Sequence, residues 1–260
     1  MKNFLYITLQ ELWQNFSLRK YGIAFAIILV TCFINYYSAF HFWLKGAHFL
    51  YSLPWYFVLF VFFFLTGMFI EGEIRFLKNK HLAILLLTAP LLFALKVTIP
   101  FAGLLPVEIN DTYKHAFQQP VSWLGGVLFI SVTLLVMHRF TEKKWNLYGI
   151  KNTSSFSPYL LLIALMIPLL LWASFRSDFS VVYPKAQVIA QTLGKEAKPW
   201  HYLLFETAYA SDFITIELFF RGFLIISLSK LLGRKCILPI ALFYFSIHLG
   251  KPMFEAISSF

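Results

Sequence analysis

Charged side chains are scarce in this sequence. Asp, Glu, Lys and Arg together make up 13% of the 260 residues, whereas a soluble domain has about 25%. Hydrophobic residues make up 59%, against roughly 45–50% in a soluble domain. This composition excludes an ordinary soluble globular protein and predicts a polytopic integral membrane protein.

Cysteines and acidic residues are few as well. Cys32 and Cys236 lie in separate apolar runs without a paired spacing, which argues against a disulfide or a cysteine metal site and predicts two core thiols. The 12 acidic residues are outnumbered by 22 basic ones, so the net charge is +10. Because the basic residues are scattered over the connecting segments, membrane headgroups account for the charge, and no nucleic-acid partner is predicted.

Long apolar stretches dominate the chain. Seven of them come close to the roughly 20 residues that a helix needs to cross a bilayer. Their approximate ranges are 21–44, 49–70, 82–105, 121–137, 159–175, 202–232 and 236–249. An eighth begins near Phe254. The sequence therefore predicts an all-α fold, a polytopic transmembrane helical bundle of about seven spans plus the start of an eighth. We expect residues 1–260 to form a single integral membrane domain.

Residues 1–20 differ from the apolar stretches. They contain Glu11 and lack both a long apolar run and a small-residue cleavage site, so they do not read as a signal peptide. Leu5 and Leu9 begin a helical spacing of apolar residues, which predicts an amphipathic helix at the membrane interface. A plain cytosolic helix stays open as the alternative.

Clusters of Lys and Arg indicate the orientation. They lie before the first apolar stretch and in 71–81, 138–156 and 233–235, and they alternate with loops that have few basic residues. The alternation predicts a cytoplasmic N-terminus in a bacterial inner membrane. Loop 174–201 breaks the pattern, but long loops cross largely regardless of charge.

Three ionisable residues stand within the apolar C-terminal part. Glu217 and Arg221 are spaced i, i+4 and so share one helix face. Each charged residue at the centre of a membrane helix costs about 2.5–3.5 kcal/mol. Counting residues along two antiparallel helices places His248 at a similar depth. A carboxylate and an imidazole around one water can hydrolyse a carbonyl compound, whereas the structural alternative is an ion pair that holds helices together.

A metal is the weaker interpretation of the same residues. Glu217 and His248 would be the ligands, and a divalent ion such as zinc stays open as a cofactor. One carboxylate and one imidazole are few ligands for such a site, and the sequence contains no His-Glu-x-x-His motif.

Two motifs resemble those of a known family. The run Glu217-Leu-Phe-Phe-Arg221-Gly is followed by Tyr244-Phe-Ser-Ile-His248. This order resembles the CAAX prenyl endopeptidase and bacteriocin-processing (CPBP, or Abi-like) family of intramembrane proteases. That family has a Glu-Glu-x-x-x-Arg motif, a Phe-x-x-x-His motif and a later His-x-x-x-Asn-like motif. The resemblance covers residues 200–260, where Ile216 stands at the first Glu position and the third motif does not occur.

The resemblance implies a function and roles for the residues. The protein would be a (metallo)endopeptidase of the membrane that cleaves a membrane-associated peptide or protein, with or without a prenyl group. Glu217 and His248 would be catalytic and Arg221 supporting. Membrane lipid would be the other partner.

Two other functions remain open at this stage. Ile216 favours a catalytically degenerate homologue that serves as a bacteriocin self-immunity factor or membrane scaffold. A proton-coupled transporter using Glu217 would need paired broken helices, for which the sequence shows no repeat. Asp212, about 140° round the helix from Glu217, either supports the site as a substitute acid or pairs with a Lys or Arg of another helix.

Overall fold

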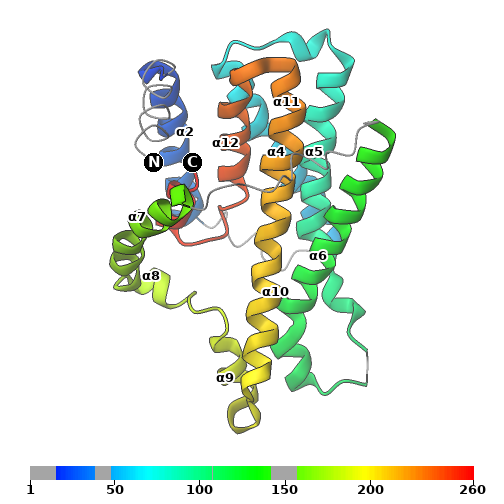
Figure 1. Ribbon diagram of the computed structural model, residues 1–260, viewed down its shortest axis with the longest axis vertical. Coiled ribbons are helices and arrows are strands. Elements are labelled where there is room, and N and C mark those ends of the chain that lie inside the picture. The colour runs from blue at the N-terminus through cyan, green and yellow to red at the C-terminus, as the bar shows by residue number, and fades with distance from the viewer. Residues whose placement is uncertain (1–15, 39–47, 107, 142–156) are drawn as a thin grey trace.

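The computed structural model describes residues 16–38, 48–106, 108–141 and 157–260 (Figure 1). Within these ranges the regular structure is helical and there is no strand, so the all-α prediction is confirmed. Most of the amphipathic helix expected in residues 1–20 lies outside the described residues.

Among the described residues, four helices are long and apolar enough to cross a membrane. They are α2 (Leu18–Tyr37), α4 (Phe49–Ile70), α5 (Lys80–Thr98) and α6 (Asp111–Thr141). Helix α4 has the bounds expected from the sequence, whereas α6 begins ten residues before the expected position 121. The structure therefore supports a membrane protein with four candidate spans, and the count of about seven stays a prediction.

Helix α5 ends earlier than the apolar pattern suggests. The expected stretch reached residue 105, but the helix stops at Thr98 and is followed by the short helix η2 (Phe101–Leu104). Ile99 is extended, with φ −61° and ψ 124°. The reason is local, because Pro100 disfavours the helical conformation of the residue before it.

The second half of the chain contains one long helical rod and a shorter helix that runs back beside it. Helices α10 (Pro199–Glu217), η5 (Leu218–Leu224) and α11 (Ile225–Leu232) follow one another without a break, and α10 and α11 lie end to end in Figure 1. The turn η6 (Gly233–Cys236) leads into α12 (Ile237–Ser246), which runs back beside the rod.

Short helices complete the fold. They are η1 (Arg75–Leu77), α7 (Ser157–Ser174), α8 (Ser177–Ser180), α9 (Gln187–Leu193), η4 (Gly194–Glu196) and α13 (Met253–Ser258). Helix α7 has 18 residues and is apolar over most of its length.

Phenylalanine rings form the centre of the bundle. Phe60 of α4 lies 5.8 Å from Phe93 of α5 and 5.4 Å from Phe243 of α12, measured between ring centroids. Phe220 of η5 contacts Phe93 at 5.4 Å and Phe243 at 5.1 Å. Offset and edge-to-face pairs of this kind are favourable beyond the area they bury. The core therefore packs η5 and α12 against α4 and α5. Most residues of the two sequence motifs lie on η5 and α12.

Helices α4 and α12 approach each other most closely at Gly67. A Cβ atom on Gly67 would lie 2.3 Å from Cα of Pro239, a backbone atom that cannot turn aside. We expect Gly67→Ala to force the two helices apart and to destabilise the protein by about 1–3 kcal/mol, the usual cost of overpacking. Thermal unfolding of the purified protein in detergent measures this effect.

The matched control is Gly22→Ala in α2. A Cβ atom there meets nothing within 4 Å, and alanine favours a helix interior over glycine by about 1 kcal/mol. Gly22→Ala should leave the midpoint unchanged or raise it. An equal loss of stability in both variants would contradict the close approach at Pro239.

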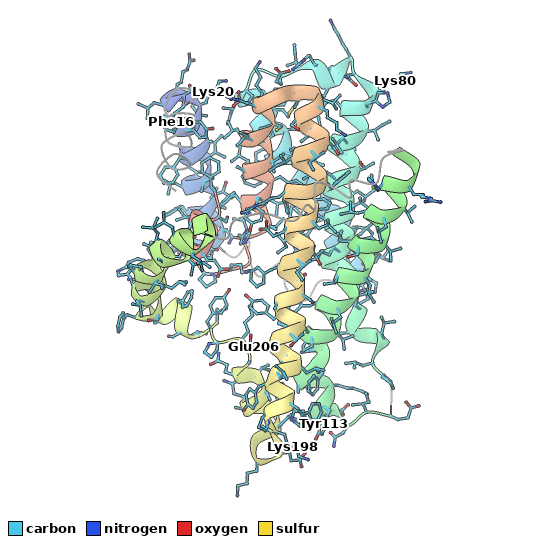
Figure 2. The ribbon with its side chains drawn as sticks, viewed as in Figure 1. Phe16, Lys20, Lys80, Tyr113, Lys198 and Glu206 are labelled. Atoms are coloured by element: carbon cyan, nitrogen blue, oxygen red, sulfur yellow. The ribbon has the colours of Figure 1, made fainter. Side chains whose placement is uncertain are left out.

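Ion pairs join the turns at one end of the bundle. Figure 2 shows Lys20 and Lys80 at this end and Tyr113 and Lys198 at the other. Glu73, between α4 and α5, lies 2.6 Å from Nε of Arg75 and 2.7 Å from Nζ of Lys235 in the turn before α12. The expected Lys and Arg clusters of 71–81 and 233–235 thus meet at the same end, whereas most of the cluster 138–156 lies outside the described residues.

Glu73 should make stability depend on pH in the acid range. Hydrogen bonds from Arg75 and then Lys235 hold the pKa of the buried Glu73 carboxyl below its ordinary value. A carboxyl whose pKa is lower in the folded state contributes stability that is complete above the unfolded pKa of about 4.3 and is lost as the pH falls through the folded pKa. We expect the thermal unfolding midpoint to decrease as the pH is lowered below about 4.3. The decrease should be less steep in Glu73→Gln. Glu196→Gln, at an exposed carboxylate, should keep the wild-type slope, and identical slopes in all three proteins would contradict the prediction.

Candidate functional site

Glu217 and Arg221 form an ion pair on the surface of the long rod. Nε of Arg221 lies 3.0 Å from Oε2 of Glu217, as the i, i+4 spacing predicts. The two side chains are 49% and 74% exposed, for Glu217 and Arg221 respectively. The pair lies about 22 Å from the Leu232 end of the rod, counted at 1.5 Å per residue. An exposed pair contributes little to stability, so its position favours access over a role in holding helices together.

The helix changes its geometry just after Glu217. Residues Leu218–Leu224 form a π-helix, in which the hydrogen bonds span one residue more than in an α-helix. Phe220 and Gly222 are buried here while Arg221 between them is exposed. Such wide turns are rare and occur frequently at functional sites. The sequence carried no signal for this feature, because its apolar pattern is continuous across it.

His248 lies just beyond the end of α12. The expected stretch reached residue 249, but the helix ends at Ser246. The His248 side chain is only 8% exposed, and its Nδ1 lies 2.9 Å from the carbonyl oxygen of Tyr244. Since a carbonyl only accepts hydrogen bonds, Nδ1 carries the proton and donates it. Nε2 of the neutral ring is then an acceptor.

Tyr244 connects the two parts of the site. Its ring lies 4.6 Å from the His248 ring and 5.0 Å from the Phe220 ring, between centroids. Glu217 and Arg221 both interact electrostatically with the Tyr244 side chain. Tyr244 therefore lies between the two groups, while the direct partner of Glu217 is Arg221 and that of His248 is the Tyr244 carbonyl. Sequence reasoning treated Tyr244 only as a substitute for phenylalanine.

Asp212 is engaged by another helix. Nζ of Lys96 in α5 lies 2.6 Å from Oδ1 of Asp212 in α10, and the side chains are 8% and 16% exposed. This is the interhelical partner that the sequence left open. The same ammonium group lies 5.1 Å from the centre of the Phe93 ring. A buried ion pair fixes the position of Asp212 and connects α5 to α10 five residues before Glu217.

A second polar cluster lies next to His248. The hydroxyl of Tyr183 donates to Oε2 of Glu255 at 2.9 Å, and Nζ of Lys251 lies 2.7 Å from Oε1 of the same carboxylate. Lys251 and Glu255 interact electrostatically with His248. Burial, followed by a hydrogen bond with Tyr209, raises the pKa of Tyr183, so its hydroxyl stays protonated and able to donate. The sequence gave no indication of the contact between Glu255 and Tyr183 across 72 positions.

The loop that carries His248 is anchored to α2. Nδ2 of Asn35, a buried side chain, donates to the carbonyl oxygen of Leu249 at 2.7 Å. The hydroxyl of Tyr36 donates to the carbonyl oxygen of Lys251. These bonds satisfy backbone groups of an irregular segment that has few helical partners, and they fix the backbone on which the imidazole sits.

The described residues contain no cluster of metal ligands. A catalytic zinc ion takes three protein ligands, and the described part of the chain contains no group of three or more His, Cys, Asp or Glu side chains arranged to hold an ion. Glu217 and His248 would by themselves supply only two donors.

Comparisons of the chain with protein-family models, with curated proteins and with solved structures found no match. The functional argument therefore rests on the two motifs and on the geometry of their side chains.

Proposed function

We propose that the protein is an intramembrane endopeptidase that resembles the CAAX-type prenyl-protein proteases in its motifs and hydrolyses a peptide bond of a membrane-associated substrate, prenylated or not. One observation carries the proposal. An accessible Glu217–Arg221 ion pair lies at mid-length of a long, mostly apolar helix and is connected through Tyr244 to an imidazole in a fixed tautomer.

The exposure of the ion pair supports a role in binding or chemistry. Phe213 and Ile225, on the same rod, are exposed as well, so the charges lie on an otherwise apolar surface. Charges facing hydrocarbon are costly, and a pair that only connected helices would be enclosed between them. Water or a polar peptide group reaching this point from the side would remove the cost.

The chemistry needs one water and the two side chains. Nε2 of His248 accepts a hydrogen bond from the water and orients it, while the Glu217 carboxylate takes a proton as the water oxygen attacks the peptide carbonyl carbon. The carbonyl π electrons move to oxygen and give a tetrahedral intermediate. When these electrons return, the C–N bond breaks, and Glu217 passes its proton to the leaving nitrogen. The products are a carboxylic acid and an amine.

Arg221 positions the carboxylate in this scheme. Its Nε bond to Oε2 leaves Oε1 of Glu217 available to the water. Arg221 touches Glu217 and not the reacting atoms, which makes it a positioning residue. The two buried anchors of the His248 loop, Asn35 and the Tyr244 carbonyl, keep the imidazole in place.

The membrane arrangement is part of the proposal. Four helices support a membrane protein, and the rod from Pro199 to Leu232, helix α12 and helix α7 would bring the number of spans to about seven. The basic turns would face the cytoplasm, with the N-terminus on the same side of a bacterial inner membrane.

A non-catalytic role is the second candidate, and Ile216 favours it. This residue stands where the related motif has its first glutamate, and it packs against the hydrophobic core. A homologue without that acid would serve as an immunity factor or scaffold and would bind a partner without cleaving it.

Cleavage by the purified full-length protein tests the proposal. Internally quenched peptides, one with a farnesylated C-terminal cysteine and one with an apolar transmembrane segment, are incubated with the protein in lipid nanodiscs. Mass spectrometry identifies the products. Time-dependent cleavage at a defined bond supports an endopeptidase. A folded protein that cleaves neither peptide over several hours would favour the non-catalytic homologue.

A further inference from the structure

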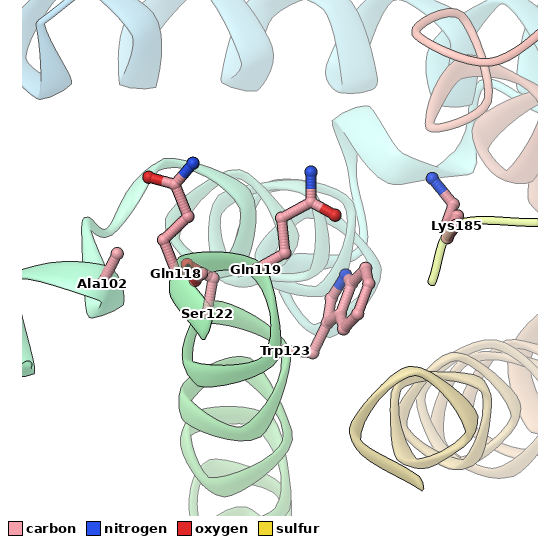
Figure 3. Close-up of a pocket in the computed structure, with 6 residues that line it drawn as sticks. All are labelled: Ala102, Gln118, Gln119, Ser122, Trp123 and Lys185. Atoms are coloured by element: carbon pink, nitrogen blue, oxygen red, sulfur yellow. Dashed lines mark hydrogen bonds between the residues drawn. The ribbon is translucent and has the colours of Figure 1, made fainter. Parts of the chain in front are cut away.

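A cavity opens between α6 and the segment before α9. Its volume is about 360 Å³, and it is lined by Ala102, Gln118, Gln119, Ser122, Trp123 and Lys185. Figure 3 shows the amides of Gln118 and Gln119 extending to the same side of α6, with the Trp123 ring between Gln119 and Lys185. The size is at the lower end of the range for ligand sites, roughly 300–1,000 Å³.

The cavity lies at the depth expected for lipid headgroups. Gln118 and Gln119 come just before Pro120, and the apolar part of α6 begins at Val121. They belong to the half of the bundle that ends at Tyr113 and Lys198, opposite the ion-paired turns (Figure 2). Trp123 continues this boundary, because tryptophan prefers the level of the headgroups. Further along α6, the exposed Leu124 and Leu128 continue into the apolar part of the helix.

The polar groups of the cavity are open to a ligand. The amides of Gln118 and Gln119 are exposed and make no hydrogen bond to the parts of the chain that the structure describes. Each amide carries two N–H donors. The Ser122 hydroxyl donates to the carbonyl oxygen of Gln118 at 2.8 Å, so it can only accept. The lining is therefore dominated by donors.

Lys185 adds a positive charge that forms no ion pair with a carboxylate of the described residues. Its ammonium lies 5.4 Å from the centre of the Tyr183 ring and 5.7 Å from that of Tyr209, and among the described residues it makes no ion pair. Burial, followed by repulsion from Lys251, lowers the pKa of Lys185. Attraction to Glu255, which is also paired with Lys251, acts in the opposite direction, and a bound anion would add to it.

We propose that this cavity binds a phosphate group through Lys185 and the amides of Gln118 and Gln119. A phosphodiester at headgroup depth presents anionic oxygens to these donors, and the Leu124–Leu128 surface would lie along the acyl chains. A soluble phosphate offers the same chemistry without the chains. Tyr209, which borders Lys185, lies eight residues before Glu217, or about 12 Å along the helix, so the phosphate site is separate from Glu217 and Arg221.

Binding of two defined probes to the purified full-length protein in detergent tests this site. The probes are dihexanoyl phosphatidylglycerol and inorganic phosphate, with dihexanoylglycerol as the phosphate-free control, and isothermal titration calorimetry measures the dissociation constants. We expect saturable binding of the phospholipid that Lys185→Gln weakens by about tenfold or more, the size of a lost charge-assisted hydrogen bond. Lys185→Arg should retain most of the affinity.

The controls separate this site from general charge and from catalysis. Lys195→Gln removes the same charge from an exposed position ten residues further along the chain and should leave binding unchanged, as should Glu217→Gln. Gln119→Leu gives a second test that keeps Lys185 in place. Competition by inorganic phosphate would identify the phosphate as the recognised group. Binding of the phospholipid but not of inorganic phosphate would identify a lipid headgroup as the source of that phosphate. Equal binding of dihexanoylglycerol, equal loss in Lys195→Gln, or no saturable binding would overturn the proposal.

Discussion

Glu217→Gln is expected to abolish peptide cleavage while the protein remains folded. The glutamine amide keeps the size of the side chain and can still accept a hydrogen bond, but it cannot take a proton from water. Loss of a general base typically reduces the rate about 10²–10⁴-fold. Because Glu217 is half exposed and its ion pair with Arg221 lies on the surface, the unfolding midpoint should change little. Initial rates with the quenched peptides, measured beside thermal unfolding, give both quantities.

His248→Gln should lower the same rate by a comparable factor. Its ring lies against Tyr244 and its Nδ1 is bound to a backbone carbonyl, so the variant loses the oriented Nε2 acceptor. The effects of the two variants should not add, because groups that act on one water fail together.

Glu206→Gln is the matched control for both variants. Glu206 is an exposed carboxylate on the same rod, eleven residues before Glu217. Its replacement should leave the rate within a factor of about two, the ordinary size of a neutral surface change. Full activity in both Glu217→Gln and His248→Gln would remove these residues from the catalytic machinery.

Helix positions followed from the sequence where apolar length and local chemistry agree. The stretch 49–70 became α4 with the same bounds, and the basic clusters of 71–81 and 233–235 meet at one end. The errors are at the ends. Pro100 stops α5 early for a reason that is local and readable. Helix α6 begins before its apolar part, because the more polar residues 111–120 belong to the same continuous helix.

The candidate site was predictable only in part, because its contacts come from two different ranges of the chain. The i, i+4 spacing was enough to pair Glu217 with Arg221. Phe219 and Phe220 of the π-helix pack against Phe93 of α5 and Phe243 of α12, contacts that no local pattern encodes. The contact of Tyr183 with Glu255 requires a long connection to return to the bundle, and sequence spacing gives no measure of that.

Lys96→Met is expected to destabilise the protein strongly. It would leave Asp212 buried between α5 and α10 without its partner at 2.6 Å. Removing one member of a buried ion pair typically costs about 3–5 kcal/mol, because the remaining charge is not compensated. Asp212→Leu should cost a similar amount for the same reason. Unfolding in mixed micelles with increasing SDS fraction measures both variants.

The double variant Lys96→Met/Asp212→Leu should recover most of the lost stability. Two apolar side chains of similar volume avoid the desolvation cost that the charges carry. If the stability losses of the two single variants add in the double variant, the two charges do not interact.

The double variant also decides what Asp212 does for the proposed reaction. If the buried Lys96 pair only fixes α10 against α5, the refolded double variant keeps Glu217, Arg221 and His248 in place and should cleave peptides at a rate close to wild type. If Asp212 supplies the acid that Ile216 lacks, the same stable protein should lose cleavage. We expect retained cleavage, because the Asp212 carboxylate is bound to Lys96 and is mostly enclosed between helices, whereas Glu217 is exposed. Loss of activity without loss of fold would instead assign Asp212 to the catalytic group and would explain how the site works with an isoleucine at position 216.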